Sequence, residues 1–168
     1  MTRADSAALS LRLILGVVMV AHGWNHWRGG GGVEGTARWF ASLGLAPPKV
    51  HAWSSVLVET AAGAALIFGV LTPVACAAVV GVMTVAGVCA HRSNGFFVFK
   101  DGYEYVLVVA VAALALGLLG PGTASVDDAL GLAAPLDGAV GALLALSGAA
   151  VAAAMLLVCW RPRTAASR

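Results

Sequence analysis

Five long apolar stretches dominate this chain, and they leave few folds open to it. They cover residues 7–23, 54–71, 73–90, 103–119 and 138–160. Each fits the roughly 17–25 apolar residues that a helix needs to cross a bilayer. The runs are continuous, whereas the strands of a membrane barrel alternate apolar and polar residues. Hydrophobic residues make up 60% of the chain and charged residues 11%, more apolar surface than a soluble core of this size can bury. We therefore predict an all-α, polytopic membrane helical bundle.

Turn-forming residues predict where these helices begin and end. Ser6 can cap the first helix, and the glycine run 29–32 ends it. Thr72-Pro73 joins the second and third spans as an antiparallel hairpin, with proline in the first helical turn. Residues 93–95 mark a loop, and residues 120–122 stop the fourth span. The first stretch also resembles a secretory signal, but no small-x-small cleavage site with a soluble region follows it.

Alternating the five spans across the bilayer places residues 24–53, residues 91–102 and the C-terminus on one side. Most basic residues fall there, namely Arg28, Arg38, Lys49, Arg92, Lys100, Arg161, Arg163 and Arg168, whereas Arg3 and Arg12 fall on the other side. Cytoplasmic loops of membrane proteins carry an excess of lysine and arginine. The basic side is therefore predicted to be cytoplasmic.

The loop between the first two spans contains a short amphipathic segment at residues 33–45. Val33, Ala37, Phe40 and Leu43 would share one helical face, so this helix is expected to lie along the interface. Tryptophans gather in or beside the loop, at positions 24, 27, 39 and 53. They are either an aromatic belt at headgroup level or a stacking site for a ring-shaped ligand.

Ionisable groups from four spans fall on this same side. Glu59 is the only charged residue of its span and lies about 9 Å below Trp53, at 1.5 Å per helical residue. A carboxyl at that depth is costly and usually faces a protein interior or a wet cavity. His22 ends the first span, His91 ends the third, and Glu104 opens the fourth. This convergence predicts a functional site in one leaflet.

The roles of these groups leave alternatives open. Glu59 is either a proton-carrying carboxylate or a hydrogen-bonding bridge between helices. His22 can relay a proton or donate to a quinone carbonyl. Glu104 is favoured at a helix N-terminus by the helix dipole, or it joins the acid–base cluster with Lys100 or Arg92 as its partner.

Other cofactors and chemistries find less support. His22 and His26, four residues apart, are weak evidence for a metal, and none is assigned. His22 and His91 can in principle hold a b-type haem, but no second histidine pair supports one. Cys76 and Cys89 lie about 20 Å apart along one helix and form no C-x-x-C pair. The net charge of +2 gives no reason to expect nucleic acid as a partner.

Several motifs occur in an order that resembles the DoxX family of bacterial membrane proteins. They are His22-Gly23, the loop 35–44, Glu59, Asn94-Gly95-Phe96-Phe97, Gly102-Tyr103-Glu104-Tyr105 and Gly120-Pro121-Gly122, spread over about residues 8–130. The resemblance implies a four-helix core in the bacterial inner membrane. Relatives include a subunit associated with thiosulfate:quinone oxidoreductase and a mycobacterial member of a membrane-associated oxidoreductase complex. The span 138–160 departs from this pattern, so residues 1–130 are predicted to form the core and residues 131–168 an added helix and basic tail.

Taken together, the residues and the resemblance predict a membrane subunit of an oxidoreductase system, of the kind found in respiratory chains. The predicted catalytic residues are Glu59, His22 and Glu104, and the predicted quinone contacts are His22, His91, Trp24 and Tyr103. The alternative is a non-catalytic scaffold that anchors redox enzymes. A small-solute carrier is less favoured, because no span is broken in mid-membrane. Lipid and either further subunits or copies of the same chain are the expected partners.

Overall fold

The computed structural model describes residues 1–162, and within that range the elements are helical. The main helices are α1 (Arg3–Arg28), α2 (Gly32–Ser42), α3 (Pro48–Phe68), α4 (Thr72–Ala86), α5 (Glu104–Leu119), α6 (Val126–Ala129), α7 (Ala133–Leu136) and α8 (Gly138–Cys159). A π-helical turn, η1 (Gly87–His91), and two 3₁₀ turns, η2 (Arg92–Asn94) and η3 (Val98–Lys100), lie between α4 and α5. Arg163 and Arg168, counted above as cytoplasmic charges, lie outside the described residues.

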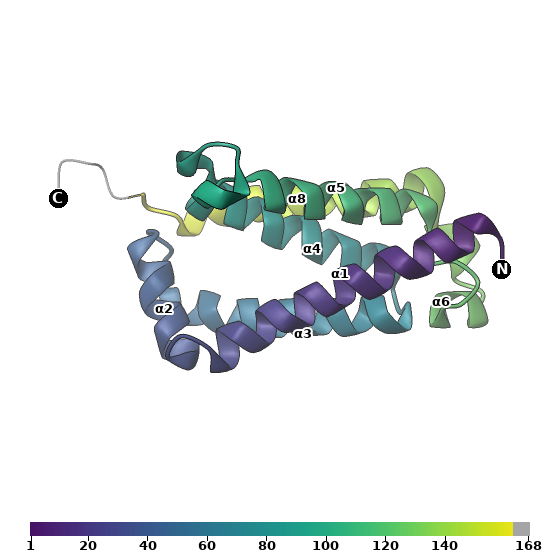
Figure 1. Cartoon of the computed structure of the whole chain (residues 1–168), viewed down its shortest axis with the longest axis horizontal. Coiled ribbons are helices and arrows are strands. Elements are labelled where there is room, and N and C mark those ends of the chain that lie inside the picture. The colour runs from purple at the N-terminus through teal and green to yellow at the C-terminus, as the bar shows by residue number, and fades with distance from the viewer. Residues whose placement is uncertain (163–168) are drawn as a thin grey trace.

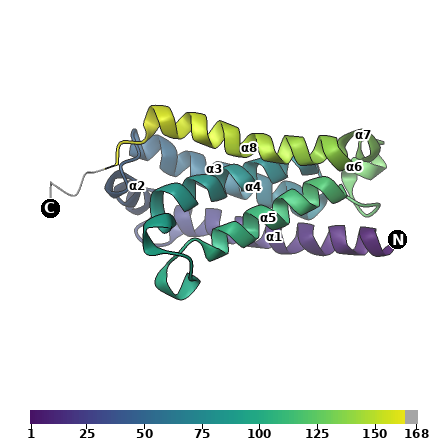
Figure 2. The ribbon, with the colours of Figure 1, turned by 90° about the horizontal axis from the view of Figure 1, so that it is seen from above.

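Helices α1, α3, α4, α5 and α8 run side by side in alternating directions (Figures 1 and 2). The N-terminus, the α3–α4 turn, α6 and α7 lie at one end of the bundle. Helix α2, the loop between η1 and α5, and the end of α8 lie at the other, which we call the α2 end. Four helical segments within residues 1–162 are long and apolar enough to cross a membrane, and α5, at 16 residues, is an apolar helix below that length. The predicted polytopic helical bundle is confirmed.

The predicted helix ends are partly right. The Ser6 cap is wrong, because Thr2 caps α1: its Oγ1 accepts from the Asp5 N–H at 3.1 Å, and Asp5 Oδ2 accepts from the Thr2 N–H at 2.6 Å. This reciprocal pairing is a capping box, which starts the helix one turn earlier. Pro73 lies in the first turn of α4, and α5 ends directly before Gly120, as predicted.

Helix α8 is packed into the bundle against α4 and α5. At its closest approach to α4 there is room for glycine alone, since a Cβ on Gly148 would collide with the Ala77 carbonyl oxygen. Across the same contact, a Cβ on Gly81 would lie 3.2 Å from the Gly148 carbonyl oxygen. Small residues allow such close helix packing in membranes. The last span is therefore an integral part of the bundle.

Replacing Gly148 with leucine is expected to destabilise the protein by about 1–3 kcal/mol, the usual cost of overpacking a close contact. The measurement is the unfolding free energy of the detergent-purified protein. Val151→Leu is the matched control, because Val151 lies on the exposed side of the same helix. If Gly148→Leu unfolds like the control, the close α4–α8 packing is contradicted.

A buried arginine holds the end of the bundle opposite α2. Arg12, 2% exposed, donates from Nε to the Leu66 carbonyl at 3.0 Å and from Nη2 to the Ile67 carbonyl at 3.3 Å. Its Nη1 donates to the carbonyls of Pro121 and Ala124 at 2.7 and 2.9 Å. Leu66 and Ile67 belong to the last turn of α3, where carbonyls lack helical partners and a positive charge is favoured. Arg12 therefore caps α3 and ties it to the segment after α5.

Asp127 performs the complementary task at the start of α4. It is 1% exposed, and its carboxylate accepts from the N–H groups of Leu71 and Thr72 at 2.7 and 2.8 Å. A negative charge at a helix N-terminus is stabilising. The α3–α4 turn is thus held by the Arg12 cation at the C-terminus of α3 and by the Asp127 anion at the N-terminus of α4. From the sequence, Arg12 was interpreted only as a topology signal, and this role was missed.

Candidate functional site

Glu59 is the buried acid of the α2 end. Its side chain is 2% exposed and lies on α3 between Ala52 and Ala62, which belong to two different apolar clusters. The Ser55 hydroxyl, one turn earlier, donates to Glu59 Oε1. The same oxygen lies 3.7 Å from His26 Nε2 on α1. Its other oxygen, Oε2, has no hydrogen-bond partner within residues 1–162. A buried carboxyl oxygen without a partner is costly and calls for an explanation.

His26 brings an imidazole to Glu59 because α1 continues beyond Gly23 to Arg28. Its ring stacks on Trp39 of α2 at 6.1 Å between centroids and 18° between planes, and it contacts Phe40 at 5.9 Å. The Thr36 hydroxyl donates to the His26 carbonyl at 3.0 Å and lies 3.4 Å from His26 Nδ1. The imidazole is therefore enclosed between α3 and α2.

Helix α2, the amphipathic segment of the sequence, covers this pair. Thr36, Ala37 and Phe40 form its buried face, and the helix runs across the bundle axis (Figure 1). Glu34 lies on α2, outside the membrane-spanning helices, and its Oε1 is 2.6 Å from Nζ of Lys49 at the start of α3. The hydrogen bond from Lys49, with its charge, lowers the pKa of Glu34. This ion pair helps to hold α2 over the site.

His22 pairs with a tyrosine of α5 that the sequence analysis did not select. Its Nε2 lies 3.5 Å from the Tyr105 hydroxyl, and the two rings stack at 6.1 Å and 27°. Both side chains are partly exposed where α1 meets α5. His22 and His26 share a face of α1, one turn apart. The His22–Tyr105 pair thus lies one helical turn along α1 from the buried His26–Glu59 pair.

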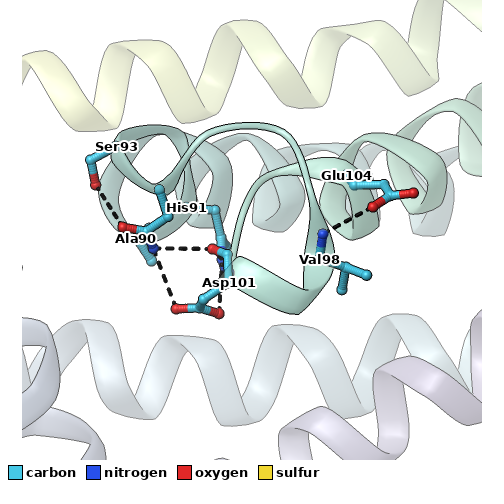
Figure 3. Close-up of polar contacts among 7 residues, drawn as sticks. Ala90, His91, Ser93, Val98, Asp101 and Glu104 are labelled. Carbon is cyan, nitrogen blue, oxygen red and sulfur yellow. Dashed lines mark hydrogen bonds and ion pairs between the residues drawn. The ribbon is translucent and has the colours of Figure 1, made fainter.

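His91 and Glu104 belong to a separate polar cluster in the loop before α5 (Figure 3). His91 Nδ1 lies 2.9 Å from the Asp101 carbonyl oxygen and 3.4 Å from its carboxylate, and Asn94 donates to the same carbonyl at 3.1 Å. The Val98 N–H donates to Glu104 Oε2 at 2.9 Å. Within residues 1–162 neither His91 nor Glu104 hydrogen-bonds or ion-pairs with Glu59. These groups hold the loop in shape.

The remaining predicted contacts face outward. Trp24 packs edge-on against Trp27 at 5.3 Å, and Tyr103 packs edge-on against Phe96 at 5.5 Å. Trp24 also lines an apolar groove of about 350 Å³ on the outer surface of α1 and α3, with Val17, Val20, Ala21 and Ile67. At about 100° per helical residue, the groove residues of α1 lie on the side of the helix away from His22, so the groove and the His22–Tyr105 pair are on different faces of α1.

The predicted residues thus meet at one end of the bundle but not in one cluster. Sequence reasoning selected His22 as the partner of Glu59, whereas the nearest imidazole nitrogen belongs to His26, four residues later. The i, i+4 spacing of His22 and His26 was available in the sequence, but it was interpreted only as weak evidence for a metal. Ser55, four residues before Glu59 on the same helix, could also have been found from spacing. Tyr105 could not, because its pairing depends on where α5 packs.

Apolar helices in alternating directions, with a carboxyl–imidazole pair buried at one end, define a multi-pass integral membrane protein. The sequence profile of the DoxX family matches residues 7–92, just over half of the chain, and the protein belongs to this family. The matched segment contains His22, His26 and Glu59 and ends before α5. No curated protein and no solved structure gives a significant match.

Proposed function

We propose that this DoxX protein is a membrane subunit of an oxidoreductase system in the bacterial inner membrane. In this proposal the His26–Glu59 pair handles protons, and the His22–Tyr105 pair binds the ring of a quinone-type cofactor. The observation that carries the proposal is the buried Glu59 carboxyl, which has one oxygen without a partner beside an imidazole. The basic residues favour a cytoplasmic location for this end.

The environment of Glu59 favours proton handling over helix bridging. A bridging carboxylate would use both oxygens, because an unsatisfied buried acceptor costs about 1–3 kcal/mol. Here Ser55 and His26 both approach Oε1, which leaves Oε2 available to take up a proton. Imidazole and carboxyl groups are common proton-transfer partners in enzymes. His26 Nδ1, near the Thr36 hydroxyl, offers a second position for the proton on the α2 side.

The His22–Tyr105 pair suits a quinone head group. Its imidazole N–H and phenolic O–H can each donate to a carbonyl oxygen, and both side chains are accessible where α1 meets α5. A bound quinone would supply the redox chemistry, because it accepts electrons together with protons. The protein would then bind the head group and deliver protons along one turn of α1.

The test is a quinone inventory of the protein purified in mild detergent from its native membrane. Wild-type protein is expected to retain extractable quinone in stoichiometric amount. Replacing His22 with alanine should weaken quinone binding at least tenfold, and Tyr105→Phe about fivefold, the loss expected for one hydrogen bond of about 1 kcal/mol. His51→Ala is the matched control, because within residues 1–162 the His51 imidazole has a single polar contact, 3.4 Å from the Ala46 carbonyl oxygen.

A wild-type protein without quinone, which nonetheless supports full activity of its partner enzymes, would overturn this proposal. The scaffold would then be the better account. If His22→Ala binds quinone with wild-type affinity, the His22–Tyr105 pair is not the binding site, even though the protein binds quinone.

A further inference from the structure

The loop between η2 and α5 exposes four apolar side chains in succession. Phe96, Phe97, Val98 and Phe99 are 44%, 51%, 54% and 77% exposed. Phe97 contacts Phe96 at 5.4 Å and Phe99 at 5.2 Å between ring centroids, so the rings form one cluster. Contiguous exposed apolar surface marks a contact with another apolar phase.

Backbone and side-chain hydrogen bonds give this loop a fixed shape. The N–H groups of Gly102 and Tyr103 donate to the carbonyls of Phe97 and Gly95, both at 3.0 Å, and the Glu104 N–H donates to Phe96 at 2.8 Å. The cluster around His91 and Asp101 closes the base of the loop (Figure 3). The aromatic cluster is therefore presented outward by the loop structure.

The loop lies in the sequence just before α5, the apolar helix that is shorter than a membrane span. Helix α5 has 16 residues, or about 24 Å at 1.5 Å per residue, against about 30 Å for the hydrocarbon core of a bilayer. The other long helical segments, with α4, η1 and η2 counted as one, have 21 residues or more. Residues 96–99 lie at the α2 end, separated from the start of α5 by residues 100–103, and the loop projects beyond the side of the helices (Figures 1 and 2). The loop thus supplies apolar surface where α5 alone falls short.

The residues near the loop are of the types that proteins place at the level of the lipid headgroups. Lys100 follows the apolar run, is exposed, and makes no ion pair within the described chain. Lysine beside apolar side chains is favoured where its charge can reach phosphates. The tryptophans Trp24, Trp27 and Trp39 lie at the same end and are exposed, as in the aromatic belts of membrane interfaces.

We propose that residues 96–99 are an interfacial anchor, inserted into the boundary between phospholipid headgroups and acyl chains, with Lys100 at the phosphates. The bilayer, and not a second protein, is the occupant of this surface, because the loop extends the lipid-facing surface of α5. The anchor sets the depth of the α2 end. Tyr105, six residues after Phe99, is then held just below the headgroups. The proposal does not depend on a quinone.

The test is the collision accessibility of a spin label in phospholipid nanodiscs. The label is attached through Val98→Cys, which keeps all three phenylalanines, in protein that carries Cys89→Ala and Cys159→Ala; Cys76 is buried and stays. Collisions with oxygen are expected to exceed those with a water-soluble nickel chelate. A label at Leu130→Cys, in the exposed loop at the opposite end, is the control. Its ratio of nickel-chelate to oxygen collisions should be higher than that of the Val98→Cys label and lower than that of a label in open water.

Preferential access of the nickel chelate to the Val98→Cys label would overturn the anchor. So would protection from both reagents, because that would reveal a protein partner or a second copy over the loop. If the variant fails to fold, the unmodified protein can be photolabelled by a phospholipid with a diazirine near its headgroup. The tryptic peptide 93–100 should then carry label, and its absence from the labelled peptides would refute the proposal.

Discussion

Replacing Arg12 with methionine is expected to lower the unfolding free energy by about 3–5 kcal/mol, the range seen when one member of a buried charged network is removed. Methionine keeps much of the side-chain volume but supplies no donor. The carbonyls of Leu66, Ile67, Pro121 and Ala124 would each lose a charged hydrogen-bond donor. The loss would release the C-terminus of α3 from the segment that follows α5.

Thermal and denaturant unfolding of the detergent-purified variants measures this effect. Arg3→Met is the control, because Arg3 is exposed at the start of the same helix. Arg12→Lys should fall between the two, since an ammonium keeps the charge but cannot span four acceptors as the guanidinium fork does. Equal stability of Arg12→Met and Arg3→Met would contradict the capping role.

The helices of this protein could be predicted from sequence because the bilayer fixes the length of an apolar segment. Apolar runs located α1, α3, α4, α5 and α8, and Pro73 and Gly120 located two of their ends. The start of α3 was placed at residue 54, six residues after its observed start at Pro48. Those six residues include Lys49 and His51, whose polar side chains lower the local hydropathy. The predicted apolar segment therefore started too late.

The pairings of the polar residues were harder to predict, because they depend on how helices pack. Arg12 was interpreted only as a topology signal, because its four carbonyl partners come from the end of α3 and the segment after α5, which lie far from it in the sequence. Glu59 was identified from its depth, but its partner depends on the rotation of α1, which places His26 and not His22 beside it. Spacing along a helix shows which residues share a face. It does not show which neighbouring helix that face contacts.

The two ends of the bundle differ in how completely their buried charges are paired. At the Arg12 end, the guanidinium and the Asp127 carboxylate both bond to backbone groups of helix termini. At the α2 end, Glu59 Oε2 has no hydrogen-bond partner among residues 1–162. A fully paired buried charge stabilises a fold, whereas an incompletely paired one costs stability and is retained where it has chemistry to perform. This contrast supports the assignment of function to Glu59.

Under the proposed function, replacing Glu59 with glutamine is expected to reduce quinone-linked turnover by about 100-fold or more, the contribution of a positioned acid–base group. Glutamine matches glutamate in size and can still accept from the Ser55 hydroxyl through its amide oxygen. It cannot exchange a proton with His26. Stability and assembly with partners should therefore stay close to wild type while turnover falls.

Glu104→Gln is the matched control for this change, because within the described residues the Glu104 carboxylate accepts one hydrogen bond, from the Val98 N–H in its own loop. A glutamine there keeps an oxygen acceptor, so turnover should change less than about threefold, in line with the loss of part of one hydrogen bond. Equal, near-normal turnover in both variants would assign Glu59 a packing role. An equal loss in both would instead show that the loop before α5 takes part in the reaction, and that the His26–Glu59 pair is not its separate proton site.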